Sequence, residues 1–187
     1  MNERFIFSPT AITGLFVVER RPIGDARGSL ERMFCAETFA RHGWRGPVAQ
    51  VNLTRTTTRG TLRGLHFQRG PHGESKLICC LRGAVHDVVV DLRAGSPTFL
   101  ARHVEVLRAE APRSLLVPEG LAHGFQALSD DVEMLYFHSA PHVPEAEGGV
   151  SAFDPRLGLD WPLPIGEMSA RDRAHPLLGE DFGGLGP

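Results

Sequence analysis

RGTLRGLHFQRGPHGESK, residues 59–76, is the stretch from which a fold class and a candidate site can first be predicted. Residues 62–68 are short, apolar and aromatic, and glycines flank them, which is typical of a β-strand between turns. Strict alternation along that strand would place Arg63 and His66 on opposite faces. Gly64 lies between them, and a glycine inside a strand often marks a bulge that redirects the following side chains. With a bulge, both residues would face one pocket; without it, this is an edge strand with a solvated arginine and a surface histidine.

Composition and charge limit the classes of function. The 187 residues are 42% hydrophobic and 22% charged, which predicts one globular domain, residues 1–187. The net charge of −2 shows no basic patch of the kind that binds nucleic acid. The N-terminal residues lack the apolar core of a signal peptide, and no apolar run reaches the roughly 18 residues of a membrane span. Three cysteines, two of them adjacent (Cys79 and Cys80), indicate buried thiols in a reducing compartment. We therefore expect a cytoplasmic protein without nucleic-acid or membrane partners.

Short strands dominate the rest of the chain. A helix is predicted at 31–42, where apolar residues recur at helical spacing, and a short one near 169–174. Strands separated by Gly, Pro, Asp or Ser turns are predicted at residues 14–20, 48–54, 62–68, 76–81, 84–92, 99–107, 114–117, 122–128 and 132–138. Many strands of this length and spacing indicate an all-β sandwich or barrel, a class that includes jelly rolls.

Several polar residues stand in these otherwise apolar strands. A charge that points inward from a strand needs partners. Asp91 fits the end of a strand, where Arg93 can brace it. Asp87 lies in mid-strand, where a purely structural role is harder to assign. His123 follows a Pro-Glu-Gly turn, near the start of a strand, where barrels expose pockets.

Two kinds of chemistry fit these residue types. Histidine, lysine, tyrosine and aspartate together can move protons beside a carbonyl, and the single tyrosine, Tyr136, is otherwise an ordinary packed aromatic. Histidines could instead bind a metal inside a barrel; the candidates are His66, His72, His86 and His123. Metal-binding cupins usually have two histidines one residue apart, followed by a glutamate, and this spacing is missing. No serine or cysteine lies in a nucleophile elbow.

A series of motifs in chain order carries a resemblance. They are GDARG (24–28), QVN (50–52), LRGLHFQ (62–68), ESKL with Lys76, GAVHDVVVDLR (83–93), GSPTF (95–99), VPEGLAHGF (117–125), LY (135–136), PEAEGGV (144–150), DP (154–155), WP (161–162) and SARD (169–172). From about residue 14 to 176 the chain resembles the dTDP-4-dehydrorhamnose 3,5-epimerases. The resemblance implies a cupin-type jelly roll with a few short helices, a core of about 14–165, and a C-terminal tail packing near the active site. It also implies a homodimer with exchanged N-terminal strands, no metal and no cofactor.

The resemblance further implies roles for individual residues. His66 would be the general base and Asp172 its orienting carboxylate. Lys76 would stabilise an enolate oxygen, and Tyr136 would be the acid on the opposite face of the sugar ring. The sugar-diphosphate site would be lined by Gln50, Asn52, Arg63 and His123, with Arg27 reaching in from a loop and Asp87 as a buried partner near Lys76. From sequence alone, Asp172 is no more than a solvated helix residue.

The chain departs from the family pattern at three places. Ile23 stands where an aromatic residue usually precedes the GDARG motif, and His142 stands where a tyrosine is usual two residues before Pro144. Both positions would sandwich the nucleotide base, so its identity stays open. The usual Trp-Asp-Asp-Pro is here residues 152–155, beginning with Ala152, which affects one pocket wall.

The leading hypothesis is an epimerase that inverts C3, C5 or both in a nucleoside diphosphate 4-keto-6-deoxyhexose, of the type that turns dTDP-4-dehydro-6-deoxy-D-glucose into dTDP-4-dehydro-L-rhamnose. An alternative within the enzyme class is the same chemistry on another nucleotide sugar. A non-catalytic sugar-nucleotide binding barrel would be expected to lack His66, Tyr136 or Asp172, and all three are present. A metal-binding cupin would be recognised by metal analysis of the purified protein.

Overall fold

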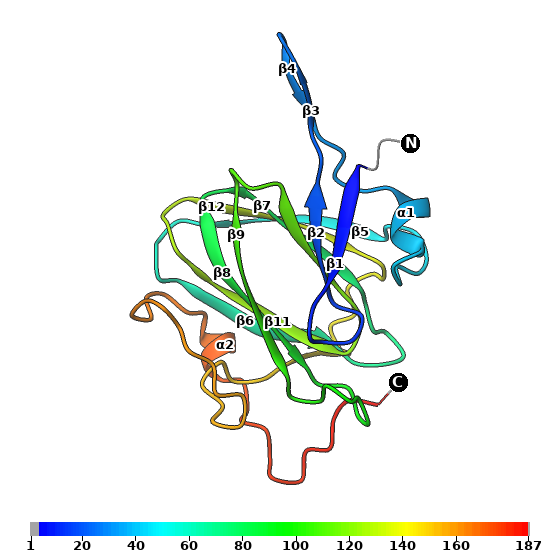
Figure 1. Ribbon diagram of the computed structural model, residues 1–187. Coiled ribbons are helices and arrows are strands. Elements are labelled where there is room, and N and C mark those ends of the chain that lie inside the picture. The colour runs from blue at the N-terminus through cyan, green and yellow to red at the C-terminus, as the bar shows by residue number, and fades with distance from the viewer. Residues whose placement is uncertain (1–3, 187) are drawn as a thin grey trace.

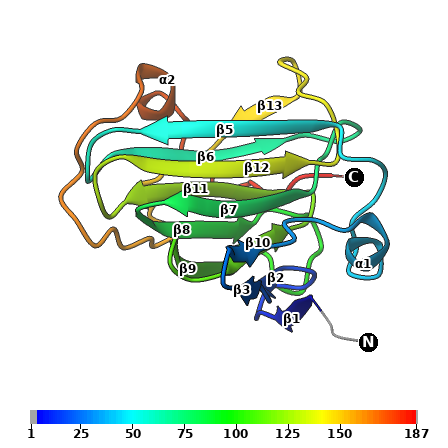
Figure 2. The same ribbon diagram turned by 90° about the horizontal axis from the view of Figure 1, so that it is seen from above.

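The computed structural model describes residues 4–186, and most of the regular structure is β-strand. A six-stranded antiparallel sheet has the order β1-β2-β10-β7-β12-β5, and a five-stranded one the order β13-β6-β11-β8-β9 (Figures 1 and 2). The strands of the first sheet are β1 Phe5–Pro9, β2 Phe16–Arg20, β5 Gln50–Thr56, β7 Lys76–Arg82, β10 Arg113–Val117 and β12 Val132–His138. Those of the second are β6 Leu62–Gln68, β8 Ala84–Asp91, β9 Arg102–Arg108, β11 Leu121–Ala127 and β13 Glu147–Gly149. This confirms the predicted all-β fold of the cupin jelly-roll type.

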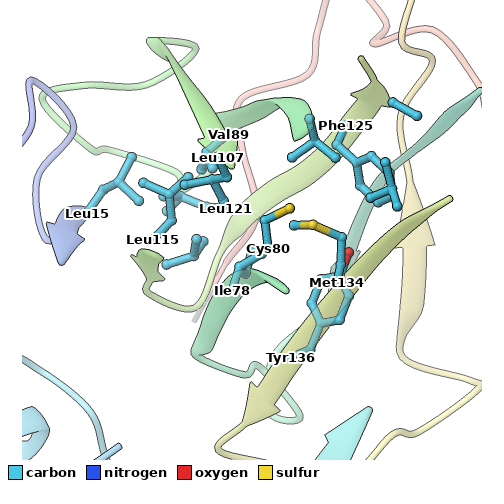
Figure 3. Packing of buried hydrophobic residues seen from close by; sticks show 14 of the residues in the cluster. Leu15, Ile78, Cys80, Val89, Leu107, Leu115, Leu121, Phe125, Met134 and Tyr136 are labelled. Atoms are coloured by element: carbon cyan, nitrogen blue, oxygen red, sulfur yellow. The ribbon is translucent and has the colours of Figure 1, made fainter. Parts of the chain in front are cut away.

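The main hydrophobic core lies between the two sheets. Ile78, Leu115 and Met134 of the six-stranded sheet pack against Val89 and Phe125 of the five-stranded one, all of them almost completely buried (Figure 3). The sequence of β12 produces this arrangement by alternation, since every second residue from Val132 to Tyr136 is buried. Face-to-face packing of two apolar sheet faces is the general solution for a sandwich.

The outer faces of both sheets are also covered. Phe39 and Trp44, in and after α1, pack with residues of β1, β2 and β7 on the outside of the six-stranded sheet. Leu157, Trp161 and Leu178 belong to the C-terminal segment and pack on the outside of the five-stranded sheet. The C-terminal segment is therefore part of the packed structure, and its path leads it past one end of the sandwich, where α2 lies (Figure 1).

The helix predicted at 31–42 is shorter than expected. α1 spans Ala36–Ala40, and the residues before it are not helical. The cause is tertiary: the Glu31 carboxylate accepts a hydrogen bond from the buried Arg20 side chain at 2.7 Å. The short C-terminal helix is confirmed as α2, Ala170–Arg173, and it begins at Ser169, whose hydroxyl accepts a hydrogen bond from the Asp172 backbone N–H at 3.0 Å.

A small hairpin stands apart from the sandwich. It consists of β3 Ile23–Asp25 and β4 Gly28–Leu30, which pair only with each other. All six residues of the two strands are exposed, and the hairpin projects away from the sheets in Figure 1. The strand at the start of the chain, β1, pairs with β2 of the same chain. Within the described residues, no helix has the length and apolar character needed to cross a membrane.

Candidate active site

The predicted bulge in β6 exists and places Arg63 and His66 in one pocket. β11 pairs His123 with His66 and Phe125 with Arg63, so two steps along β11 match three along β6. The extra residue lies at Gly64, which has φ +111°, and a Cβ there would come within 2.7 Å of the Gly124 Cα atom. Only glycine fits this close crossing of two backbones. Both Arg63 and His66 line the pocket, as the bulge hypothesis requires.

His66 is held by the C-terminal segment. Its Nε2–H donates to Asp172 Oδ1 at 2.8 Å, and the Gly64 backbone N–H donates to the other carboxylate oxygen at 3.2 Å. Burial on its own raises the pKa of Asp172, but the hydrogen bonds from His66, Gly64 and Ser169 outweigh it and lower the pKa to about 2. The carboxylate is therefore ionised at neutral pH and fixes the tautomer of His66, leaving Nδ1 as the basic nitrogen.

Tyr136 and Lys76 lie on the opposite wall of the same pocket. They belong to β12 and β7 of the six-stranded sheet, whereas His66 belongs to β6 of the five-stranded sheet. Burial raises the pKa of Tyr136, with a smaller contribution from the charge of Asp87, so its hydroxyl keeps its proton at neutral pH. A ligand between the sheets would have a histidine base on one side and a phenol with an ammonium group on the other.

Asp87 does not partner Lys76 as predicted. Its carboxylate is fully buried and accepts from His123 Nε2–H at 2.9 and 3.0 Å. The reason is strand register: β8 pairs with β11, which carries His123, so the two side chains come from neighbouring strands. The His123 ring lies 6.0 Å from the Tyr136 ring, at an angle of 67°. His123 is thus at the pocket wall, as predicted, with its orientation set by Asp87.

The pocket has a volume of about 950 Å³, which is at the upper end of the range for small-molecule sites. Gln50, Asn52 and His142, which the family resemblance assigns to substrate binding, are among its lining residues, and their binding role stays a prediction. The side-chain oxygen of Gln50 accepts a hydrogen bond from the His142 backbone N–H at 3.2 Å. The His142 ring is about half exposed and lies 3.3 Å from Glu147.

Three other residues of the predicted site lie elsewhere in this chain. Ile23 and Arg27 are on the β3–β4 hairpin, where the Arg27 guanidinium pairs with Asp25 at 2.5 Å and is 90% exposed. The hairpin does not line the main pocket. Ala152 is buried and does not line the main pocket, and its carbonyl accepts a hydrogen bond from the Trp161 indole N–H at 3.0 Å. It packs in one cluster with Leu62, a residue of the pocket lining.

Sequence reasoning missed several residues at or beside the pocket, and four of them bear on its chemistry: Glu74, His138, Arg171 and His175. Signals for three of them were present in the sequence. Glu74 and Lys76 are two residues apart, and so are Tyr136 and His138, so alternation places each pair on one face. Arg171 adjoins Asp172 and pairs with Glu147 at 2.9 Å. The ring of His175 lies 5.4 Å from the His66 ring, edge to face, and nothing in the sequence indicated it.

One group within residues 4–186 has the ligand atoms to hold a metal ion. It consists of His66, Asp172 and His175, whose ligand atoms lie within 4.8 Å of one another. His66 Nε2 and Asp172 Oδ1, 2.8 Å apart, already form a hydrogen bond with each other. The group therefore fits proton transfer better than metal binding.

A base oriented by a carboxylate, facing a phenol and an ammonium group across a pocket, defines a class of protein: a jelly-roll enzyme that moves protons on a carbon beside a carbonyl. The model of one family, described as dTDP-4-dehydrorhamnose 3,5-epimerase, matches residues 9–180. The chain belongs to this family and is an isomerase.

Relatives and solved structures agree with this assignment. A dTDP-4-dehydrorhamnose 3,5-epimerase of Streptomyces griseus is 41% identical over 92% of this chain and 86% of its own length. The crystal structure of a Legionella pneumophila 3,5-epimerase in complex with dTDP-4-keto-L-rhamnose has a TM-score of 0.87 and 35% identity, covering 92% of each chain. A 3'-monoepimerase of Streptomyces bikiniensis in complex with dTDP-quinovose has a TM-score of 0.86 and 38% identity, covering 95% of this chain and 91% of its own.

Proposed function

We propose that the protein epimerises a dTDP-4-keto-6-deoxyhexose at C3, C5 or both, with dTDP-4-dehydro-6-deoxy-D-glucose as the substrate. The observation that carries the proposal is the placement of His66 and Tyr136 on opposite walls of one pocket. Inversion of a carbon centre requires removal of a proton from one face and its return on the other. Two acid–base groups on facing sheets meet that requirement.

The steps follow from the positions of the groups. The C4 ketone acidifies the hydrogens on C3 and C5, and His66 Nδ1 takes one of them. The negative charge moves to the ketone oxygen, where the Lys76 ammonium group stabilises the enolate. Asp172 stabilises the imidazolium that forms on His66. Tyr136 then donates its proton to the opposite face of the carbon, so the substrate loses and gains one proton, and both groups return to their starting states by exchange with water.

The sugar diphosphate of the substrate is proposed to bind along Gln50, Asn52, Arg63 and His123, with His142 beside the base. The protein is further proposed to be a cytoplasmic homodimer with exchanged N-terminal strands, in which the hairpin brings Ile23 and Arg27 to the partner's pocket. Support comes from the exposure of the hairpin and from Arg27, whose side chain bonds among residues 4–186 to Asp25 alone. Solved relatives bound to dTDP or dTDP sugars support the choice of nucleotide.

A single-centre reaction is a second candidate, because relatives include a 3'-monoepimerase. Incubation in heavy water with a panel of 4-keto sugar nucleotides distinguishes the two. Deuterium at both C3 and C5 of the dTDP sugar is expected for the double epimerase, and deuterium at C3 alone for the single-centre enzyme. We expect the rate to survive dialysis against a strong chelator. Lack of exchange with every member of the panel would contradict the proposed function.

A further inference from the structure

A carboxylate that the proposed mechanism does not use lies beside Lys76. Glu74 Oε1 is 3.2 Å from the Lys76 ammonium nitrogen, and Glu74 Oε2 accepts a hydrogen bond from His138 Nδ1–H at 2.7 Å. All three side chains line the pocket and are at least 88% buried. Among the described residues, Glu74 is the one carboxylate that forms an ion pair with Lys76.

The backbone holds these side chains in place. Lys76 of β7 lies directly opposite His138 of β12 in the sheet. Between Glu74 and Lys76, the Ser75 N–H donates to the Ser139 hydroxyl at 2.8 Å, and the Ser139 N–H donates to the Ser75 carbonyl at 3.0 Å. The segment that carries Glu74 is thereby fastened to the end of β12, although it precedes the first residue of β7.

Lys76 and Glu74 form an ion pair of opposite charges at 3.2 Å. Burial raises the pKa of Glu74, but the hydrogen bond from His138 and the charge of Lys76 outweigh it, and the net effect is a lowered pKa. Glu74 is therefore ionised at neutral pH. A largely buried ammonium group is costly unless it is paired, and the four-carbon stem of a lysine leaves its head group free to move. The fixed carboxylate of Glu74 both pairs with the buried ammonium group and limits its movement.

We propose that Glu74 is a positioning residue for Lys76, and that His138 holds Glu74 in the required orientation. The inference rests on the proposed function, in which Lys76 stabilises the enolate. A donor stabilises developing charge best when it is already in place before the reaction starts. The negative charge of Glu74 also repels the enolate, so the benefit of fixing Lys76 must exceed this electrostatic cost. Neutralising Glu74 therefore lowers kcat if positioning dominates and raises kcat if repulsion dominates.

Glu74→Gln tests the balance without changing the size of the side chain. We expect kcat for solvent deuterium exchange to fall about 10- to 100-fold, below the full loss of an enolate-stabilising donor, with KM changed by less than about threefold. Glu105→Gln is the matched control, because Glu105 is also mostly buried and pairs with an arginine and a histidine, Arg113 and His103, away from the pocket. This control should keep the kcat of the parent.

A double-mutant cycle separates positioning from a general structural effect. In a Lys76→Met background, Glu74→Gln should change kcat by no more than about twofold, because the group that Glu74 positions is already gone. His138→Asn, which leaves Glu74 and Lys76 in place, should give an intermediate loss and serves if Glu74→Gln does not fold. Glu74→Gln with kcat equal to or above that of the parent would overturn the inference, as would an undiminished loss in the Lys76→Met background. A parent protein without exchange would instead overturn the proposed function.

Discussion

The walls of the pocket and the β3–β4 hairpin carry similar kinds of side chain in opposite settings. In the pocket, polar and charged side chains are fixed by neighbours, as His66 is by Asp172 and Lys76 by Glu74. On the hairpin, Arg27 is 90% exposed and its partner, Asp25, is two residues away. The side chains of the pocket can act within one chain, since the two sheets define their geometry. The hairpin can contribute to catalysis only if another molecule, such as a partner subunit, covers it.

The largest expected effect concerns the pocket. His66→Asn keeps size and polarity but removes the proton acceptor, so solvent deuterium exchange into the substrate should fall about 100- to 10,000-fold. His72→Asn is the matched control, because His72 is exposed in the loop after β6 and does not line the pocket. A His66→Asn enzyme that exchanges within tenfold of the parent would show that the base lies elsewhere.

The next effect tests whether the hairpin acts at all. Arg27→Ala should raise KM about tenfold, the scale of one lost charge-assisted hydrogen bond, without lowering the melting temperature. Arg41→Ala is the control, since Arg41 is also exposed and pairs with a nearby acid, Glu37, at 2.9 Å. An unchanged KM for Arg27→Ala would mean that the hairpin takes no part in substrate binding, and the contrast between the two regions would then be purely structural.

A smaller effect concerns the nucleotide base. Ile23 and His142 stand where two aromatic faces are usual in the family, and base stacking is worth about 1–3 kcal/mol in nucleic-acid complexes. With that contribution reduced, dTDP, UDP, GDP and CDP should bind within about 1.4 kcal/mol of one another, or one decade in affinity. Calorimetry on the four diphosphates measures this directly. A hundredfold preference for dTDP would point to another residue in place of the usual aromatic clamp.

The smallest expected effect is on the free energy of unfolding. Its dependence on pH should differ between a carboxylate in the pocket, Asp172, and one on the hairpin, Asp25. Because the pKa of Asp172 is lowered to about 2, its ionised form stabilises the fold above the unfolded-state pKa near 4, and this contribution is lost as the pH falls towards 2. The stability difference between the parent and Asp172→Asn should therefore shrink between pH 4 and pH 2. Asp25→Asn, on the exposed hairpin, should show little difference at any pH. If Asp172→Asn and Asp25→Asn changed stability with the same pH dependence, the lowered pKa of Asp172 would be contradicted.

Particular residues show what the sequence could predict. Gly64 indicated a bulge, because a glycine inside a strand allows the backbone to take the conformation that a bulge needs, and the alternation in β12 placed Tyr136 inward. The partner of Asp87 could not be predicted, since it depends on which strands are neighbours and in which register. The predicted helix start at residue 31 was wrong for a similar reason, because Glu31 bonds to the buried Arg20 and the helix begins at Ala36. The local sequence pattern thus predicts which face of a strand a side chain occupies. Which side chain it contacts depends on how distant strands pair, and the local pattern does not show this.

The bond between His66 and Asp172 joins residues 106 positions apart. During synthesis, the chain leaves the ribosome from its N-terminus, so the strands up to β12 emerge before α2 does. Until residues 170–173 reach the open end of the sandwich, His66 has no carboxylate to orient it, although the sheets that surround it can already pair. The arrival of α2 is thus a late step in building the site, and a chain cut short before α2 is expected to form the sheets but to lack the carboxylate that orients His66.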